Sequence, residues 1–392
     1  MADRIGVLTG GGDVPGLNSA IKSVVYRSTE LGHEVLGIRR GWMGLTHCRP
    51  ADETDGEWVR PLDRRNTRTI DRTGGTVLHT SRTNPAAMHG VDLPPHLGDE
   101  SRRRYQVDED TYDLTPLVVD NIQALGLGHL VVIGGDDTLG YGSRLGSEGV
   151  PLVAIPKTMD NDVQGTEYCI GFSSAITRAR ELINRQRTTL GSHERIGVFR
   201  IFGRNSGYTA WYAAYVTGAR CVIPEAPFDL DDLTAILVDD RSLNPSRYSL
   251  VIVSEGAVWT GGRVEEVGEA DAYGHRHKAD VGDLLAAEIK RRSGIDTVHS
   301  DLTYDLRSGD PDALDTMVAI TFANVAMDLL ESGISARMTA IRDGKYAHSP
   351  LPDRALGARK LDASRLYNAA RFRPNYAEEL GSPLLLGPSL GG

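Results

Sequence analysis

The sequence has little cysteine, and this excludes several kinds of site. Of 392 residues only three are cysteines, Cys48, Cys169 and Cys221, and they are far apart. An odd number of scattered cysteines offers no disulfide framework, and there is no Cys-x-x-Cys pair to begin a zinc site. We therefore expect reduced thiols in a cytoplasmic protein.

Long hydrophobic runs are also missing. No apolar run approaches the roughly 18–20 residues that a membrane-spanning helix needs, so we expect no membrane partner. The first residues, Met1 to Gly6, lead directly into a pattern typical of a strand and leave no room for a signal peptide. Both absences favour a cytoplasmic location.

An excess of positive charge is absent as well. The formal net charge is −10, from 43 Lys and Arg against 53 Asp and Glu. This argues against a nucleic-acid partner, because non-specific binding to phosphate backbones depends on positive charge. An anionic small substrate needs only local positive charge, and several arginines crowd the stretch from Arg60 to Arg82. For most of them a solvated basic loop is the simple alternative.

What the chain does contain is an alternation of short apolar runs and amphipathic segments. This alternation predicts an α/β fold with mostly parallel sheets, because βαβ units build parallel strand pairs. The length suits two α/β domains with separate cores. Expected strands are 5–9, 33–38, 130–133, 152–155, 196–199, 221–223 and 250–253, and expected helices are 15–32, 173–189, 206–218, 229–239, 281–293 and 312–331. Polar residues 88–112 are expected to form a surface insertion.

Two segments carry most of the chemical information, Val132–Thr138 (VIGGDDT) and Pro156–Asp162 (PKTMDND). Each leaves an apolar run with strand character and enters a turn rich in polar residues. Backbone N–H groups at strand ends and helix starts can hold phosphate, and carboxylates there can hold Mg²⁺ or accept a proton. Lys157 and Thr158 can contact phosphate oxygens. These are the parts that phosphoryl transfer requires.

A glycine-rich turn, Gly10–Gly12, adds a third segment between a strand and a helix. Glycines at this place let the backbone approach a phosphate closely, and the helix dipole favours negative charge. A structural tight turn is the alternative. The turn is not a Walker A motif, because no Gly-Lys-Ser/Thr follows it.

Asp136 is expected at the carboxyl end of a parallel strand, where ligands bind in open α/β sheets. The alternative is that Asp136 only caps the next helix. Asp136, Asp160 and Asp162 would repel one another if they met without a cation. This favours Mg²⁺ at the site, since Mg²⁺ uses one or two carboxylates together with substrate oxygens and water.

On these segments, and over the chain from Gly6 to about residue 340, the sequence resembles the phosphofructokinase family. The pair Asp137 and Lys157 makes it similar to the pyrophosphate-dependent branch. The resemblance implies two Rossmann-like three-layer α/β domains with the active site in the cleft between them. The phosphoryl-donor domain would comprise 1–171 plus about 308–345, and the sugar-phosphate domain 172–307 plus about 346–392.

The resemblance also implies roles on the donor side. Asp160 matches the catalytic base, and Asp136 and Asp162 match the carboxylates that hold Mg²⁺. Gly11, Lys157 and Thr158 would contact the donor, with Arg82 between the two phosphate sites. ATP-dependent bacterial relatives carry glycine at the positions of Asp137 and Lys157. The glycine at the first position leaves room for the nucleotide's α-phosphate, whereas the side chain of Asp137 would fill that space and its charge would repel the phosphate.

On the sugar side the match is spread over several segments. The resemblance assigns contacts with the sugar phosphate to residues of these segments: Phe202, Gly203, Arg204, Glu225, Tyr304 and Arg307. Arg195 matches an arginine that the family contributes from a neighbouring subunit, which implies a homodimer or homotetramer. For each arginine taken alone, a surface salt bridge is the alternative.

Two departures from the family pattern stand out. The position of a second arginine from the neighbouring subunit is Val298 here, with His299 beside it, so the acceptor is less well defined than the reaction type. In the bacterial ATP enzymes, two basic residues of the first helix bind an effector. Lys22 fits one of them, but Tyr26 occupies the other position, and we expect weak or absent nucleotide regulation.

The reaction implied by the resemblance is reversible, Mg²⁺-dependent transfer from pyrophosphate to the 1-hydroxyl of fructose 6-phosphate, a step of glycolysis and gluconeogenesis. The alternatives are ATP as donor on the same fold, an NAD or lipid kinase that shares the GGDDT element, and a catalytically silent sugar-phosphate sensor. The roles of the 88–112 insertion and of the tail after residue 385 are not readable from the sequence.

Overall fold

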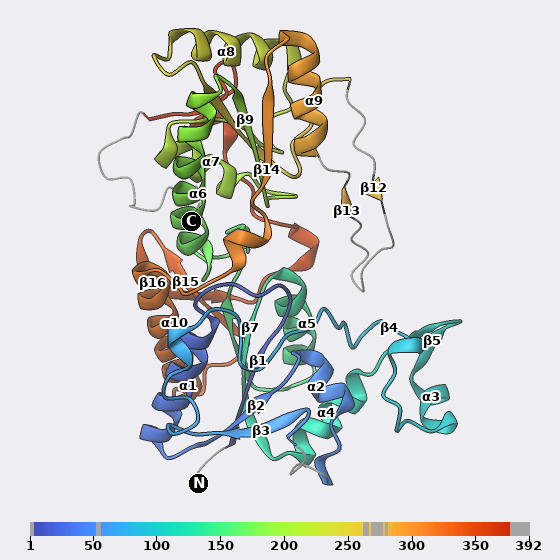
Figure 1. Ribbon diagram of the computed structural model, residues 1–392. Coiled ribbons are helices and arrows are strands. Elements are labelled where there is room, and N and C mark those ends of the chain that lie inside the picture. Colours follow the sequence, from blue (N-terminus) through green and yellow to red (C-terminus); the bar gives the residue numbers. More distant parts are fainter. Residues whose placement is uncertain (1–3, 52–55, 262–265, 268–276, 279–280, 377–392) are drawn as a thin grey trace.

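The computed structural model describes residues 4–51, 56–261, 266–267, 277–278 and 281–376. Two sheets lie one beyond the other along an elongated molecule, and helices cover both faces of each sheet (Figure 1). The expected α/β architecture with mostly parallel sheets is confirmed. The C-terminal tail named above, from residue 385, lies outside the described residues.

The first sheet has seven strands in the order β16-β15-β8-β7-β1-β2-β3. Its five inner strands run parallel, and β16 and β3 are antiparallel edges. The strands are β1 Arg4–Thr9, β2 Glu34–Ile38, β3 Val59–Leu62, β7 Leu127–Gly134, β8 Leu152–Pro156, β15 Arg337–Arg342 and β16 Lys345–Pro350. Placing β1, β7 and β8 side by side brings the three glycine- and aspartate-rich turns to one edge of the sheet.

Side chains along each inner strand alternate between two apolar cores, as a period of two requires. In β7, Val131 and Ile133 face the core that includes α1 and α10, whereas Leu130 and Val132 face α2, α4 and α5. These helices are α1 Leu17–Leu31, α2 Trp42–His47, α4 Thr115–Ala124, α5 Asp136–Ser147 and α10 Ala313–Glu331. The sheet is therefore the middle layer of three.

The second sheet has four parallel strands in the order β10-β11-β9-β14. Helices α6 and α7 cover one face, and α8 and α9 cover the other. The strands are β9 Ile196–Ile201, β10 Arg220–Val222, β11 Ser249–Ser254 and β14 Thr297–Asp301; the helices are α6 Phe172–Ser192, α7 Tyr208–Thr217, α8 Leu230–Leu243 and α9 Val281–Ser293. One apolar core, containing residues of α1, α10, α6 and α7, continues through both units.

The 88–112 region projects from the first unit (Figure 1). It is not irregular: β4 Met88–His89, β5 Gln106–Asp108 and β6 Thr111–Tyr112 form a small antiparallel sheet beside α3 Asp99–Tyr105. A core of its own, including Met88, Leu97 and Tyr105, supports it. Its polar sequence hid this core because only a few scattered apolar residues build it.

Several strands have no counterpart in the sequence-based expectation. β14 (TVHSD) is a polar, half-buried edge strand, and β15 and β16 form a hairpin that closes the edge of the first sheet. The seven-stranded sheet includes β16 up to Pro350, a few residues beyond the limit of about 345 that is predicted for the first domain. The hydrogen bonds between β16 and β15 place β16 in this sheet, and the hydropathy of residues 345–350 alone does not indicate a strand.

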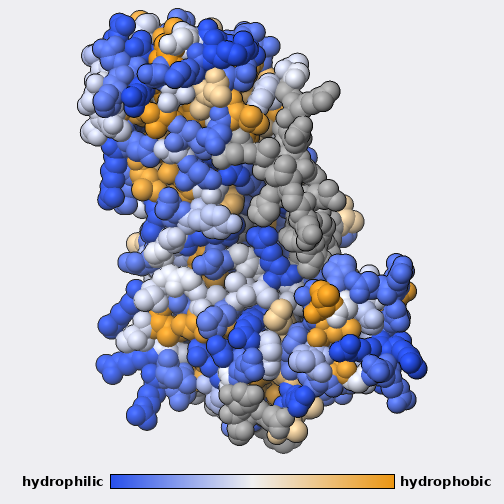
Figure 2. Space-filling view, turned by 45° about the vertical axis from the view of Figure 1, so that its right-hand side comes forward, coloured by the Kyte–Doolittle hydropathy of each residue, from blue (hydrophilic) through white to orange (hydrophobic). Residues whose placement is uncertain are grey.

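Helix α10 is apolar enough for its length that, by composition alone, it could cross a membrane, and it is the one such helix within the described ranges. Half of its most apolar window is buried inside the protein. It packs through Val318, Phe322 and Ala326 in the core shared by the two units. The surface seen in Figure 2 is mostly hydrophilic, with apolar residues in small groups.

Candidate active site

The three turns that follow β1, β7 and β8 meet at the carboxyl edge of the first sheet. The Gly10 N–H donates to the Ile133 carbonyl at 3.0 Å, and the Lys157 N–H donates to the Gly134 carbonyl at 2.9 Å. The carboxyl edge of a parallel sheet is where open α/β folds bind ligands. The structure thus brings together the Gly10–Gly12 turn, the start of α5 and the PKTMDND turn.

Lys157 lies at the centre of this edge, and its side chain is buried. Its Nζ is 3.0 Å from where a Cβ on Gly11 would be, and Gly11 has a left-handed φ of 78°. Burial is the main cause that lowers the pKa of Lys157 to about 7; the positive charges of Arg307 and Arg82 act in the same direction, and Asp13 opposes them. The ammonium therefore faces the glycine turn, as a phosphate contact requires.

Asp160 interacts with this lysine, and Asp162 interacts with both Asp160 and Asp136. Burial raises the pKa of Asp162 well above its usual value, and repulsion from Asp160 and Asp136 raises it further. Burial also raises the pKa of Asp160, although Arg307, Arg204 and Lys157 oppose the shift. The three predicted aspartates therefore lie close enough to repel one another, and Asp160 also feels positive charge from both units.

The PKTMDND turn is held by its own side chains. Thr158 Oγ1 accepts a hydrogen bond from the Asp160 N–H at 3.1 Å. Asn161 is buried, has a left-handed φ of 53°, donates to the Glu167 carbonyl and accepts from the Cys169 N–H. Asparagine tolerates this backbone conformation better than most residues. Asp160 Oδ1 is buried and, among the described residues, has no hydrogen-bond partner.

Asp136 and Asp137 are the first two residues of α5, after Gly135 at the N-cap position. Negative charge is favoured there by the helix dipole. Asp136 therefore takes part in the first turn rather than acting as the cap, and its charge reaches Asp162.

Arg307 connects the two units. It lies in the short turn Tyr304–Arg307 after β14, and its guanidinium stacks over the Phe202 ring at 4.4 Å. Its Nη1 donates to the Asp13 carbonyl at 3.1 Å, and a side chain at Gly12 would overlap it. Tyr304 packs edge-on against Phe202, at 5.7 Å between ring centres. The predicted sugar-phosphate arginine therefore sits directly against the predicted donor turn.

Glu225 follows β10 and faces the same junction. Its Oε1 accepts from the N–H groups of Gly207 and Leu361, each at 2.9 Å. Its Oε2 is buried and has no hydrogen-bond partner in the part of the chain that the structure describes. One carboxylate oxygen is thus held in place while the other is available to accept from a hydroxyl. Gly203, with a left-handed φ of 124°, turns the chain between Phe202 and Arg204.

The segment that carries Arg82 is bonded to the glycine turn. The Gly11 N–H donates to the Ser81 carbonyl at 2.9 Å, and Thr80 Oγ1 donates to the Gly11 carbonyl at 2.6 Å. Arg82 itself is near enough to Lys157 to lower the pKa of that lysine. Arg82 therefore lies beside the glycine turn, and its place between two phosphate sites stays a prediction.

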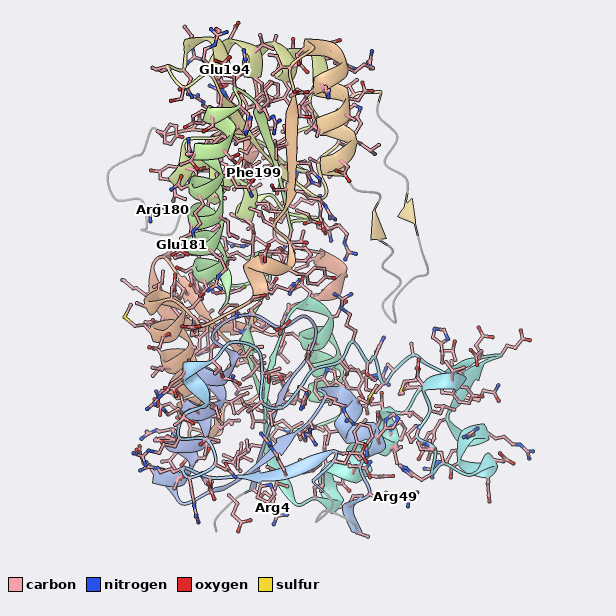
Figure 3. The ribbon with its side chains drawn as sticks, viewed as in Figure 1. Arg4, Arg49, Arg180, Glu181, Glu194 and Phe199 are labelled. Atoms are coloured by element: carbon pink, nitrogen blue, oxygen red, sulfur yellow. The ribbon has the colours of Figure 1, made fainter. Side chains whose placement is uncertain are left out.

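Arg195 is the predicted site residue that this chain does not bring to the junction. It directly precedes β9, whereas Phe202 directly follows it, so the two lie at opposite ends of that strand. Its neighbour Glu194 is labelled at the far end of the second unit in Figure 3. Val298 lies at the same end, since it pairs with Gly197 of β9.

Two side chains at the junction were not singled out from the sequence. Asp13 ends the Gly-Gly-Gly-Asp turn, so its motif could have identified it. Arg359 is buried and donates to the carbonyls of Asn161 and Glu167 from a segment without any recognisable pattern. Only the fold reveals Arg359.

Two pockets lie away from this junction. One, of 300 Å³, adjoins His47, Trp58 and His96, and the other, of 320 Å³, adjoins Lys22 and Tyr26. In the second, Lys22 forms an ion pair with Asp71 at 2.8 Å. Neither contains a predicted catalytic residue. These two pockets therefore do not mark the candidate site, which is defined by the convergence of charged and unpaired groups.

The aspartates fit a hard cation such as Mg²⁺. Their carboxylate oxygens are suitable metal ligands, and a bound cation would relieve the repulsion between these carboxylates. Within the described ranges, no group of three His, Cys, Asp or Glu side chains is arranged to hold a metal by itself.

The chain is similar to known proteins over most of its length. The family model "Phosphofructokinase" matches residues 4–330. The chain is 38% identical over 352 residues, 89% of its length, to a pyrophosphate–fructose 6-phosphate 1-phosphotransferase of Thermoproteus tenax, covering 92% of that protein. It is 36% identical over 86% of its length to ATP-dependent 6-phosphofructokinase 3 of Streptomyces coelicolor, covering 91% of it.

A solved structure shares the fold. The pyrophosphate-dependent phosphofructokinase of Marinobacter aquaeolei superposes with a TM-score of 0.71 at 18% identity, over 95% of this chain and 89% of that one. The strand-end turns, the buried lysine and the clustered aspartates thus occur in a chain whose sequence and fold both match one family. This chain belongs to the phosphofructokinase family of phosphotransferases.

Proposed function

We propose that the protein transfers a phosphoryl group reversibly from pyrophosphate to the 1-hydroxyl of fructose 6-phosphate, with Mg²⁺. The observation that carries this proposal is the arrangement of charged side chains where the two units meet. Asp160, with an unpaired oxygen, lies between the donor turn and the arginines of the second unit. An acceptor hydroxyl delivered from the second unit would therefore meet a carboxylate and a phosphate site together.

In this proposal Asp160 accepts the proton of the 1-hydroxyl as the new P–O bond forms. A carboxylate within hydrogen-bond reach of the hydroxyl suffices for this role. Lys157 and the backbone around Gly11 hold the transferring charge, while Thr158 and Arg82 contact the phosphates. Such pre-placed positive groups supply much of the stabilisation in phosphoryl transfer.

Asp136 and Asp162 are the residues that would hold Mg²⁺, which when bound neutralises charge on the pyrophosphate. On the acceptor side, Glu225 would accept from a sugar hydroxyl through its unpaired Oε2. Arg204, Arg307 and the Phe202–Tyr304 pair would form the wall for the sugar phosphate. A planar guanidinium with several donors suits a phosphate group well.

The choice of pyrophosphate rests on Asp137 and Lys157. A carboxylate in the first turn of α5 would repel and obstruct the α-phosphate of a nucleotide. Relatives named for either donor are similarly close in sequence to this chain. ATP is therefore the second candidate donor. Membership of the phosphofructokinase family argues against the NAD-kinase and lipid-kinase alternatives.

The first prediction concerns the donor. A coupled assay of fructose 1,6-bisphosphate formation with Mg²⁺, run with equal concentrations of pyrophosphate and ATP, should show turnover with pyrophosphate and little with ATP. Asp137→Gly should raise activity with ATP and lower the preference for pyrophosphate by about tenfold or more. Removal of a charge repulsion of about 1.4 kcal/mol changes a rate about tenfold. Activity with ATP alone in the unmodified chain would contradict pyrophosphate as the donor.

A further inference from the structure

The C-terminal segment, residues 351–376, lies beyond the part of the chain that the family model matches. It leaves β16 of the first sheet and reaches the second unit. There, Tyr367 Oη donates to the Cys221 carbonyl at 2.6 Å, and Trp211 Nε1 donates to the Leu366 carbonyl at 2.7 Å. The segment therefore spans the junction that contains the candidate active site.

Arg359 is the residue of this segment that contacts the PKTMDND turn. Its backbone N–H donates to the Asp162 carbonyl at 2.6 Å, and its Nη2 donates to the carbonyls of Asn161 at 2.6 Å and Glu167 at 3.2 Å. Only 3% of Arg359 is exposed. Three backbone carbonyls on both sides of the turn are thus bonded to a single residue.

These contacts bear on the least favourable part of the turn. Asn161, between Asp160 and Asp162, holds a left-handed φ of 53°. Such a conformation persists only when its surroundings enforce it. Arg359 does this from the outside, since its guanidinium holds the Asn161 carbonyl while Asn161's own side chain spans the turn from within.

The same stretch also contacts the sugar side. The Arg359 guanidinium stacks over the Tyr208 ring at 4.4 Å, and Tyr208 Oη donates to the Lys360 carbonyl at 3.1 Å. The Leu361 N–H donates to Glu225 Oε1 at 2.9 Å. Residues 359–361 therefore contact both the turn that carries the candidate base and Glu225, the candidate sugar-binding residue, and fix their positions relative to each other.

We propose that Arg359 is a positioning residue for phosphoryl transfer, which sets the orientation of Asp160 and Asp162 by closing the backbone of their turn. The inference rests on the proposed function. Arg359 contacts backbone carbonyls and not the reacting groups, so its removal should lower kcat while leaving KM for both substrates nearly unchanged. Misplacement of catalytic groups by about 1 Å can cost about 100-fold in rate.

The test compares Arg359→Met and Arg359→Lys with a control, Arg365→Met, in the full-length protein. Met approximates the length of the side chain without any donor. Lys keeps the charge and hydrogen-bond donors, but it lacks the planar guanidinium that stacks over the Tyr208 ring and holds the donors in place. Arg365 lies on the same segment with its side chain exposed. kcat, KM for each substrate and the unfolding temperature are measured for all four proteins.

We expect kcat to fall about 10–100-fold in Arg359→Met, as for other residues that orient ligating groups, and less in Arg359→Lys. KM should stay within about threefold, and Arg365→Met should match the parent. If Arg359→Met does not fold, a reduced kcat in Arg359→Lys at an unchanged unfolding temperature carries the inference.

Parent-like kcat in Arg359→Lys and Arg359→Met, or an equal loss in Arg365→Met, would overturn the role of Arg359. A rise in KM with unchanged kcat would also overturn it, since it would indicate a binding contact instead. Silence of the parent protein with both pyrophosphate and ATP would overturn the proposed function, and the inference with it.

Discussion

At the scale of single residues, Lys157 combines two properties that oppose each other, a charge needed beside phosphate and nearly complete burial. Desolvation disfavours the ammonium, and Arg307 adds repulsion, so the pKa falls to about 7. Pyrophosphate or another anion would restore the favourable environment of the charge. The free protein therefore carries a group that is costly for folding and useful for binding.

A pH-dependent prediction follows for the free protein. Lys157 is charged below about pH 7 and neutral above it, so kcat/KM for pyrophosphate should fall as the pH rises through this value. Lys157→Arg keeps its charge throughout and should lack this alkaline decline, whatever its absolute rate. Steady-state kinetics from pH 6 to 9 check this, and identical profiles for the two proteins would contradict it.

The same residue predicts a change in stability. Between about pH 7 and its ordinary value of 10.5, Lys157 binds a proton in the unfolded chain but not in the folded one. The free energy of unfolding therefore rises with pH across this window, and below pH 7 the full penalty applies. Lys157→Met should raise the unfolding temperature by a few degrees, most at pH 6 and without phosphate. Lys345→Met, at an exposed position, is the control and should change little.

At the scale of secondary-structure elements, the start of α10 is joined to the start of α6. Asp312 caps α10 by accepting from the Asp315 N–H at 2.9 Å, and its other oxygen accepts from the hydroxyls of Ser173 and Thr177 at 2.6 and 2.9 Å. Asp315, buried beside it, accepts from Tyr168 Oη and the Gly171 N–H. These bonds fix how the first helix of the second unit leaves the first unit.

Removing this cap should cost more than removing an ordinary one. Asp312→Ala loses the cap and two hydroxyl bonds, so we expect the free energy of unfolding to fall by about 2–3 kcal/mol. Asp229 caps α8 through backbone N–H groups alone, and Asp229→Ala should cost about 1 kcal/mol. Chemical denaturation of both variants checks the difference, and equal losses would contradict the joining role of Asp312.

At the scale of the whole molecule, the position of Arg195 separates it from the junction of its own chain. It lies at the other end of β9 from Phe202, together with Val298. If Arg195 acts in a neighbouring subunit, as proposed for a homodimer or homotetramer, each active site is completed across an interface.

Mixed oligomers test this proposal. Asp160→Ser should be nearly inactive alone, since loss of a general base costs about 10²–10⁴-fold. Arg195→Ala should also be nearly inactive alone, because every site in its oligomer lacks the arginine from the neighbouring subunit. Mixed by co-refolding, they should regain up to about a quarter of the parent activity, because a hybrid dimer has one intact site. No recovery in a mixture shown to contain hybrids would place Arg195 in its own chain's site, or outside any site.

The sequence by itself determined the turns and their order: glycines, aspartates and a lysine after apolar runs specify strand-end phosphate chemistry because local patterns suffice to form each turn. It also indicated the α/β architecture, since the long helices such as α1 and α6 and apolar strands such as β7 and β8 each have their own period, whereas α4, α5 and β15 were not predicted. Only the tertiary structure decided which groups meet. Arg307 reaches Asp13 across the two units, Arg359 closes the turn between Asp160 and Asp162, and the polar strands β14 and β16 complete the sheets. The two arginine contacts join residues 294 and 198 positions apart, and their energy arises from burial and hydrogen bonding that no local window contains.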